Sequence, residues 1–267
     1  MSSVILIGKN SFLGRAFLDA SLGHHDVRAV SHDEDLAGID FSAYDAVVNM
    51  AYHPQYMREA YDTTLDMDVK LASILAGLSR RPHFFMMSTR LVYGRAAPMP
   101  VSETQTPAPV DHYGINKLAT ETAITTLLGS GATILRLPNV FGFELARHTF
   151  CGIALDRLKG TGRIVLDVSP FTVRDFLPVE DFAGILVKLV QVKPPGLFNL
   201  GSGQATSVGR IVMWIVEGYG KGELLVTDWR ERDPHLLCTR KTERLLGSYT
   251  DMINVRSACI RIGEGIR

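Results

Sequence analysis

A short apolar run that enters a helix through a glycine-containing turn is the feature that most restricts the fold of this chain. Val4–Ile7 are all apolar, and a helical pattern occupies 15–21. A strand that leads into a helix in this way presents backbone N–H groups and the positive end of the helix dipole, which together bind a pyrophosphate. We expect that site to use the turn residues Gly8, Asn10, Ser11, Phe12, Leu13 and Gly14.

Ser11 makes this turn an imperfect match to a dinucleotide site. Such a turn usually has three glycines, and in this chain the middle one is Ser11. Its side chain crowds a phosphate slightly but also offers a hydroxyl donor. The alternative is an ordinary turn between a strand and a helix.

Strand and helix patterns alternate along the chain, which predicts an α/β protein with a Rossmann-like, doubly wound parallel sheet. Ligand is then expected at the carboxyl ends of the strands. The predicted strands are 4–8, 26–31, 45–50, 83–88 and 132–137, and the predicted helices are 12–21, 56–79, 112–128, 180–191 and 206–218. Apolar residues of 56–79, Met57 among them, recur at helical spacing and are assigned to the core.

The chain is expected to divide into two parts. Residues 1–138 and about 178–198 form the dinucleotide-binding domain, and 139–177 with 199–267 form a small, discontinuous C-terminal lobe. The second lobe is expected to bind the substrate.

Charge and composition exclude several classes of protein. The 267 residues carry a formal net charge of zero, without the basic footprint of a nucleic-acid-binding protein. No apolar run approaches the ~20 residues of a membrane span, and 4–7 is too short for a signal peptide, so we expect a soluble, cytoplasmic protein. The cysteines Cys151, Cys238 and Cys259 are odd in number and widely spaced, which argues against a disulfide framework and a metal site.

Tyr113 and Lys117 are the pair with the clearest chemical meaning. Four residues apart on a helix, they share one face and can point at one bound molecule. A nearby ammonium lowers the pKa of a phenol from its ordinary value of about 10, which suits a general acid/base. Thr89, next to the strand 83–88, offers a hydroxyl to a carbonyl oxygen. The set predicts carbonyl–alcohol redox chemistry, and the alternative is an ordinary surface pair.

The chain resembles the extended short-chain dehydrogenase/reductase family, the NAD(P)-dependent sugar-nucleotide epimerases, dehydratases and reductases. The resemblance runs over nearly the whole chain, in family order and spacing, through the segments VVNMAYHP, STRLVYG, LRLPNVFG, VRDFLPVEDFA and GLFNLGSG. It implies that Asn49, Ala51 and Leu137 lie beside the cofactor. It also implies catalytic roles for Thr89, Tyr113 and Lys117, the last two of which contact the cofactor as well.

The resemblance leaves the choice between NAD and NADP open. Family members that prefer NAD usually end the second strand with an acidic residue, and this chain has Ser31 followed by His32 there. Because the carboxylate is missing and Asp33 comes too late, we favour NADP, whose 2′-phosphate Ser31 and His32 would contact. The alternative is that both are ordinary polar residues at a strand end, compatible with either cofactor.

The residues after Thr89 narrow the reaction that the resemblance implies. Dehydratases carry Asp and Glu at the next two positions, and 3,5-epimerising reductases carry a cysteine at the second, whereas this chain has Arg90 and Leu91. Neither side chain shuttles protons at ordinary pH. Reduction or oxidation at one carbon remains, or 4-epimerisation. Arg90 is either a substrate contact or a solvated or ion-paired arginine.

Three residues suggest the substrate class. By resemblance, Arg174 and Arg230 form a clamp on the diphosphate of a nucleotide sugar, and Asn139 contacts the sugar phosphate. The chain departs from the family in its short 143–173 stretch and in Cys238, where Asp is usual.

We therefore expect an NAD(P)-dependent reductase of a nucleotide-linked 4-keto-6-deoxy sugar. The alternatives are a sugar-nucleotide 4-epimerase and, from another class, a non-catalytic dinucleotide-sensing or scaffold protein. By resemblance, helices 56–79 and 112–128 also predict a homodimer, with apolar residues Met67, Val69, Ile124 and Leu127 in support. The alternative is that these residues are buried against the sheet of a monomer.

Overall fold

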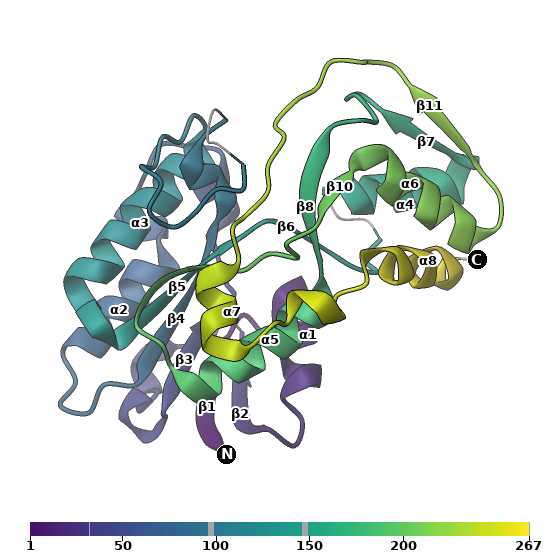
Figure 1. Cartoon of the computed structure of the whole chain (residues 1–267). Helices are drawn as coiled ribbons and strands as arrows, with labels where there is room; N and C mark the ends of the chain where they lie inside the picture. Colours follow the sequence, from purple (N-terminus) through teal and green to yellow (C-terminus); the bar gives the residue numbers. More distant parts are fainter. Residues whose placement is uncertain (32, 96–98, 146–148, 267) are drawn as a thin grey trace.

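The main sheet is fully parallel, in a computed structural model that describes residues 1–31, 33–95, 99–145 and 149–266. Within those residues its strand order is β2-β1-β3-β4-β5-β9 (Figure 1). The strands are β1 Ser2–Ile7, β2 His25–Val30, β3 Ala46–Asn49, β4 His83–Thr89, β5 Ala132–Leu137 and β9 Gly196–Asn199. Because the order reverses between β1 and β3, their carboxyl ends border the crevice where such a sheet binds ligands.

Helices cover both faces of this sheet, as the alternating pattern predicts (Figure 1). They are α1 Phe12–Ser21, α2 Met67–Ala76, α3 His112–Leu128 and α5 Val179–Val192. Successive residues of β1 point to opposite faces. Val4 and Leu6 pack in one core with α1 and α5, whereas Ile5 and Ile7 pack in another with α2 and α3. The predicted fold class is therefore confirmed.

The predicted helix 56–79 is wrong in its first half. Before α2, the chain makes two 3₁₀ turns, η3 Pro54–Met57 and η4 Thr63–Leu65. Asp66 stops any continuous helix here, because its extended backbone and its side chain, which accepts from Val69 N at 3.1 Å, form the N-cap of α2. Met57 is consequently 40% exposed rather than part of the core.

A second group of strands and helices follows β5 and lies beside the main sheet (Figure 1). Its strands are β6 Asn139–Phe141, β7 Arg163–Leu166, β8 Val173–Pro178, β10 Ala205–Ser207 and β11 Glu223–Val226, in sheets ordered β10-β8-β6 and β11-β7. Its helices are α4 Phe150–Thr161, α6 Val208–Tyr219, α7 Arg240–Leu246 and α8 Val255–Gly265. Helices α6 and α8 cross at Gly218 and Gly263, where a Cβ would overlap the backbone of the other helix. The chain returns to the main sheet through α5 and β9.

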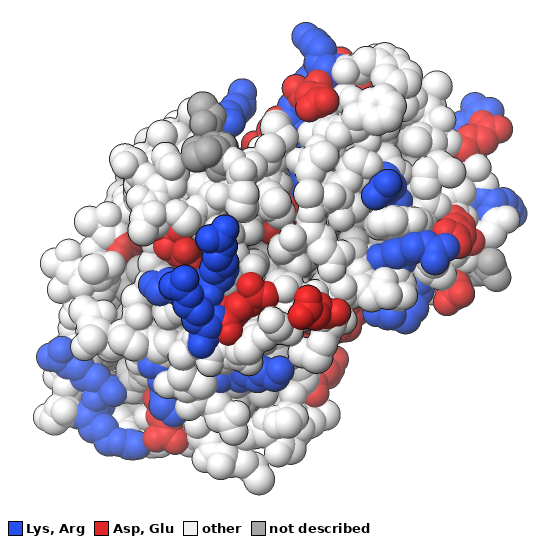
Figure 2. All heavy atoms as spheres, viewed as in Figure 1, with Lys and Arg blue, Asp and Glu red and all other residues white. Residues whose placement is uncertain are grey.

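The surface and the cysteines complete the description. Acidic and basic side chains are intermixed over the face shown in Figure 2. No helix of the described residues is both long and apolar enough to cross a membrane. Cys151, Cys238 and Cys259 form no disulfide with one another, and Cys151 and Cys259 are buried in the apolar core.

Candidate active site

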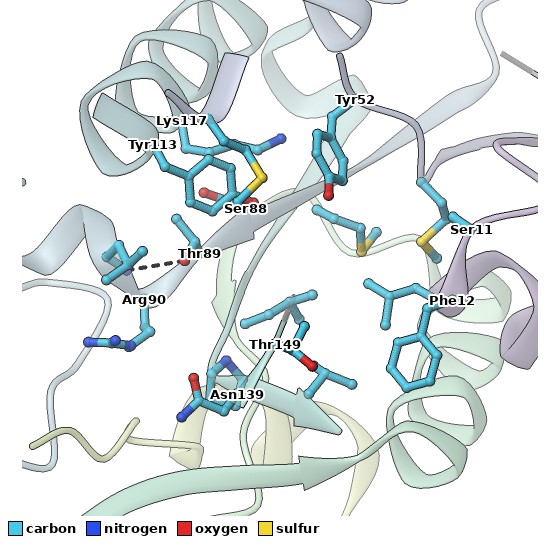
Figure 3. A pocket seen from close by; sticks show the side chains of 18 of the residues that line it. Ser11, Phe12, Tyr52, Ser88, Thr89, Arg90, Tyr113, Lys117, Asn139 and Thr149 are labelled. Atoms are coloured by element: carbon cyan, nitrogen blue, oxygen red, sulfur yellow. Dashed lines mark hydrogen bonds between the residues drawn. The ribbon is translucent and has the colours of Figure 1, made fainter. Parts of the chain in front are cut away.

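A cavity of about 710 Å³ opens at the carboxyl ends of the main-sheet strands. It extends from the first residues of α1, past the end of β3, to the end of β4 and one face of α3. Figure 3 shows side chains from these elements arranged around one space. Of the predicted site residues, those that line it are Ser11, Phe12, Leu13, Asn49, Ala51, Thr89, Arg90, Tyr113, Lys117, Leu137 and Asn139.

The turn between β1 and α1 is built for close approach of backbone. Gly8 has φ of 92°, and a Cβ there would lie 2.9 Å from Ala51 N at the end of β3. A Cβ on Gly14 would overlap the carbonyl oxygen of Gly8. Ser11 is the N-cap of α1 and accepts from Gly14 N at 3.0 Å. Gly8, Asn10 and Gly14 belong to this turn without lining the cavity, whereas Ser11, Phe12 and Leu13 line it. The positive end of the α1 dipole therefore lies at the cavity, which is an arrangement that favours bound anions.

The end of β3 joins the cavity to a buried carboxylate. The Asn49 carboxamide accepts from Ala51 N at 3.0 Å and donates to Asp68 Oδ1 at 2.7 Å. Asp68, in the first turn of α2, also accepts from Lys117 Nζ at 3.0 Å. Although burial opposes its charge, the pKa of Lys117 lies above its ordinary value, because Asp68 and the phenols of Tyr113 and Tyr56 surround it. Lys117 is therefore a fixed, charged ammonium.

The proposed catalytic side chains come from two elements. Tyr113 and Lys117 lie on α3, whose N-cap Asp111 accepts from Gly114 N at 2.8 Å, and they extend into the same space (Figure 3). Thr89 ends β4, and its Oγ1 accepts from Leu91 N at 3.3 Å, which leaves the hydroxyl hydrogen available as a donor. The structure thus brings together the three residues that the sequence singled out.

Arg90 faces the cavity but is held by an ion pair. Its guanidinium donates to both carboxylate oxygens of Asp233, with Nη1 to Oδ1 at 2.7 Å. Leu91 also lines the cavity. The two positions that carry proton shuttles in dehydratases therefore present a bound guanidinium and an aliphatic side chain.

The structure does not bring the two predicted clamp arginines into the cavity. Arg174 is half-buried and donates to the carbonyl oxygen of Arg232 at 3.0 Å, and its buried Nε has no hydrogen-bond partner within the described part of the chain. Arg230 is 78% exposed at its side chain and pairs with Asp228 at 2.7 Å. Asn139, in contrast, lines the cavity at the start of β6.

At the end of β2, the structure reveals a carboxylate that sequence reasoning missed. Glu34 Oε1 accepts from Ser31 N at 2.8 Å and from Lys9 Nζ at 3.0 Å. Ser31 does not line the cavity, and His32 lies outside the described residues. A carboxylate therefore does lie at the end of β2, but it belongs to a loop residue three positions after Ser31 and not to the strand itself.

Other lining residues were not predicted. Asp68 falls within the predicted helix 56–79, and its separation of 49 positions from Lys117 hides their contact in the sequence. Tyr52 also lines the cavity, as do Met57 and Arg58, which precede α2 because that helix begins only at Met67. Thr149 and Phe150, at the start of α4, close the side opposite α3.

Comparisons with known proteins agree with this geometry. The sequence profile of the NAD dependent epimerase/dehydratase family matches residues 4–201. The dTDP-L-rhamnose 4-epimerase of Burkholderia thailandensis is 32% identical over an alignment of 126 residues that covers 44% of this chain and only 35% of that protein.

Two solved structures share the fold over the whole chain. TunA, an NAD-dependent NDP-hexosamine 5,6-dehydratase of tunicamycin biosynthesis, has a TM-score of 0.82 at 20% identity, covering 100% of this chain and 97% of that one. RMD from Pseudomonas aeruginosa, solved with NADPH, has a TM-score of 0.80 at 18% identity, covering 100% and 99%. With the profile match over most of its length, the chain belongs to the NAD-dependent epimerase/dehydratase family.

Proposed function

We propose that this protein is an NAD(P)-dependent reductase of a nucleotide-linked 4-keto-6-deoxy sugar. The observation that carries the proposal is the convergence of Thr89, Tyr113 and Lys117 on the cavity that begins at the α1 turn. Arg90, whose guanidinium is bound, and the aliphatic Leu91 also argue against a dehydratase, since neither side chain is a proton shuttle for elimination.

Each residue of the site has a distinct role in the proposed carbonyl reduction. When bound, the nicotinamide supplies a hydride. Thr89 holds the carbonyl oxygen of the substrate through its hydroxyl, and Tyr113 gives that oxygen a proton as it becomes an alkoxide. Lys117 fixes the nicotinamide ribose and lies close enough to Tyr113 to influence its charge. Ser11 and the first turn of α1 hold the pyrophosphate.

Support for a nucleotide sugar comes from the second lobe. Asn139 lines the cavity. Arg174 has a buried Nε without a hydrogen-bond partner among the described residues, and its side chain would have to turn toward the cavity to donate to a diphosphate. Arg230 would have to leave Asp228 to contribute, so we assign the clamp to Arg174 first. The relatives named above act on dTDP-L-rhamnose and an NDP-hexosamine, which is the same class of substrate.

A sugar-nucleotide 4-epimerase is the second candidate, favoured by the likeness to the rhamnose epimerase. That reaction needs the same three residues, but Tyr113 must first act as a base, and the cofactor returns to its starting state in each cycle. A non-catalytic dinucleotide sensor is a weaker candidate, because a binding protein has little use for the proton donor Tyr113.

One assay separates the three. Purified protein is incubated with nucleotide-linked 4-keto sugars, and the loss of NADPH or NADH absorbance is followed at 340 nm. Stoichiometric loss, abolished in Tyr113→Phe, supports the reductase. Conversion of a nucleotide sugar to its 4-epimer without net cofactor loss would replace it with the epimerase, and cofactor binding without either reaction would leave the sensor.

A further inference from the structure

The strongest feature that the proposed mechanism does not use is the buried carboxylate behind Lys117. Asp68 is 4% exposed and has both oxygens engaged, Oδ2 by Lys117 Nζ at 3.0 Å and Oδ1 by Asn49 at 2.7 Å. The side chains of the Lys117–Asp68 pair are only 6% and 5% exposed, so water screens it little. The ammonium thus enters the site with its own counter-ion.

Several other polar or charged groups surround Tyr113 and Lys117. Tyr56, from η3, lies edge-on to Tyr113 with ring centroids 6.4 Å apart, and Lys117 Nζ lies 5.4 Å from the centre of the Tyr56 ring. The hydroxyl of Tyr56 is engaged with Thr120 at 2.5 Å, and burial raises its pKa, so this phenol stays neutral. The other titratable or charged groups that share the cavity or lie on the elements around the pair are Tyr52, Cys151, Arg58, Arg90 of η5 (Arg90–Tyr93), Asp66 before α2, Tyr61, Asp111 and His112 at the start of α3, and the Glu121–Arg136 ion pair.

The counter-ion Asp68 weakens the electrostatic effect of Lys117 on the phenol of Tyr113. An isolated ammonium stabilises the phenolate and makes tyrosine a better base. A carboxylate 3.0 Å from that ammonium offsets much of the field at the phenol and also holds the ammonium in place. A tyrosine beside such a pair retains its proton at neutral pH, which suits donation to a developing alkoxide better than abstraction from an alcohol.

We propose that Asp68 is a positioning residue that acts through Lys117: it orients the ammonium toward the cofactor site and keeps Tyr113 protonated, ready to give its proton to the carbonyl oxygen. This inference rests on the proposed function, because it is in that reaction that Tyr113 gives its proton to a substrate.

The test is a titration of Tyr113 in the protein without substrate or cofactor. Tyrosine labelled with ¹³C at Cζ gives one resonance per ring, and Tyr113→Phe identifies the one that belongs to Tyr113. In Asp68→Asn we expect the pKa of Tyr113 to fall by about one pH unit or more. Asp66→Asn is the matched control, because Asp66 caps α2 and bonds Tyr61 but does not contact Lys117; its effect should be clearly smaller.

Two results would overturn the inference: an unchanged Tyr113 titration in Asp68→Asn, or equal shifts in both variants. The wild-type protein supplies a measurement that does not depend on folding of a variant. If Tyr113 of the wild type titrates more than about one pH unit below the ordinary value of 10, Asp68 does not offset Lys117.

Steady-state kinetics separate this inference from the proposed function. For an active keto-sugar reductase, Asp68→Asn should move the alkaline limb of the pH profile of reduction to lower pH. A shifted titration with no turnover of any keto sugar would remove the proposed function and leave the electrostatic role of Asp68. Turnover of a keto sugar with an unshifted titration of Tyr113 would support the proposed function and remove the electrostatic role of Asp68.

Discussion

Arg90, just after β4, donates two hydrogen bonds to the carboxylate of Asp233, which lies 143 positions further along the chain. The two side chains are only 11% and 25% exposed, so their ion pair is largely desolvated. The pair joins the strand that carries Thr89 to the segment that follows β11. It therefore fixes the second lobe against the mouth of the candidate active site.

Breaking this pair should destabilise the protein. We expect Arg90→Met to lower the free energy of unfolding by about 2 kcal/mol, because Asp233 is left partly buried without its cation. Asp233→Asn should do the same, and asparagine tolerates the left-handed backbone of that position, whose φ is 57°. In urea unfolding, the double variant should lose less free energy of unfolding than the two single variants lose together. Strict additivity of the two losses would contradict a direct interaction.

The same pair predicts a dependence of stability on pH. Burial alone would raise the pKa of Asp233, but Arg90 holds it below its ordinary value. A carboxyl group of this kind stabilises the fold above its unfolded pKa of about 3.9 and loses that contribution as the pH falls through its folded pKa. The difference in unfolding free energy between wild type and Asp233→Asn should be constant near neutral pH and shrink below about pH 4. A difference that grows on acidification would assign the stabilisation to another group.

Removing the phenol hydroxyl tests the proton donor. Tyr113→Phe keeps the aromatic ring and its packing against Tyr56, so cofactor affinity should change little. Turnover should fall by about 10² to 10⁴, the usual worth of a positioned general acid. Fluorescence titration with NADPH and single-turnover kinetics measure the two quantities separately. Near-normal turnover would remove Tyr113 from the mechanism.

The role of Lys117 in catalysis can be distinguished from its role in stability by also changing its partner, Asp68. Lys117→Met leaves Asp68 buried without its ammonium and should lower the free energy of unfolding by about 3 kcal/mol, together with cofactor affinity and turnover. Adding Asp68→Asn should recover most of the stability but none of the turnover, because the missing ammonium serves the cofactor and Tyr113. Recovery of turnover in the double variant would show that Lys117 is needed only to neutralise Asp68.

The sequence predicts the parts of this fold whose causes are local. The bounds of α1 and α3 match the expected helices because Ser11 and Asp111, each an N-cap, stand directly before the helical patterns. The apolar run Val4–Ile7 is buried on both faces, which makes it recognisable as a central strand. Thr89, Tyr113 and Lys117 were recognisable by type and spacing.

The remainder depends on contacts between distant residues. Lys117 and Asp68 are 49 positions apart, and nothing in the local pattern of either indicates the other. The helix predicted over 56–79 fails in its first half because apolar spacing continues across Asp66, whose side chain caps α2 and also accepts from Tyr61 and from the distant Thr120. Glu34 is not predicted from the sequence because the family pattern places the acidic residue at the end of the second strand. Glu34 follows that strand and folds back onto it.

Cofactor preference can be tested at the end of β2. Glu34 accepts from Ser31 N, so its charge lies beside a residue that we expect to contact the 2′-phosphate of NADP. Glu34→Gln should raise affinity for NADPH relative to NADH several-fold by removing like-charge repulsion, and Ser31→Asp should do the opposite. Binding titrations of both cofactors with wild type and each variant provide the measurement. A preference for NADH in wild type would contradict the choice of NADP, and unchanged ratios in both variants would place the adenosine elsewhere.

Assembly as a homodimer through α2 and α3 stays a prediction, and the structure narrows the residues that can carry it. Ile124 is fully buried in the core of the single chain, and Met67 and Leu127 pack against that core, so these residues give no support. Ile115, on the outer side of α3, is 46% exposed and remains available. If the two-fold contact exists, light scattering at micromolar concentration should give twice the 29.4 kDa of one chain, and Ile115→Glu should halve that mass. Met213→Glu, at a 53% exposed position on α6, is the control and should leave the mass unchanged. A wild-type mass near that of one chain would reject the dimer.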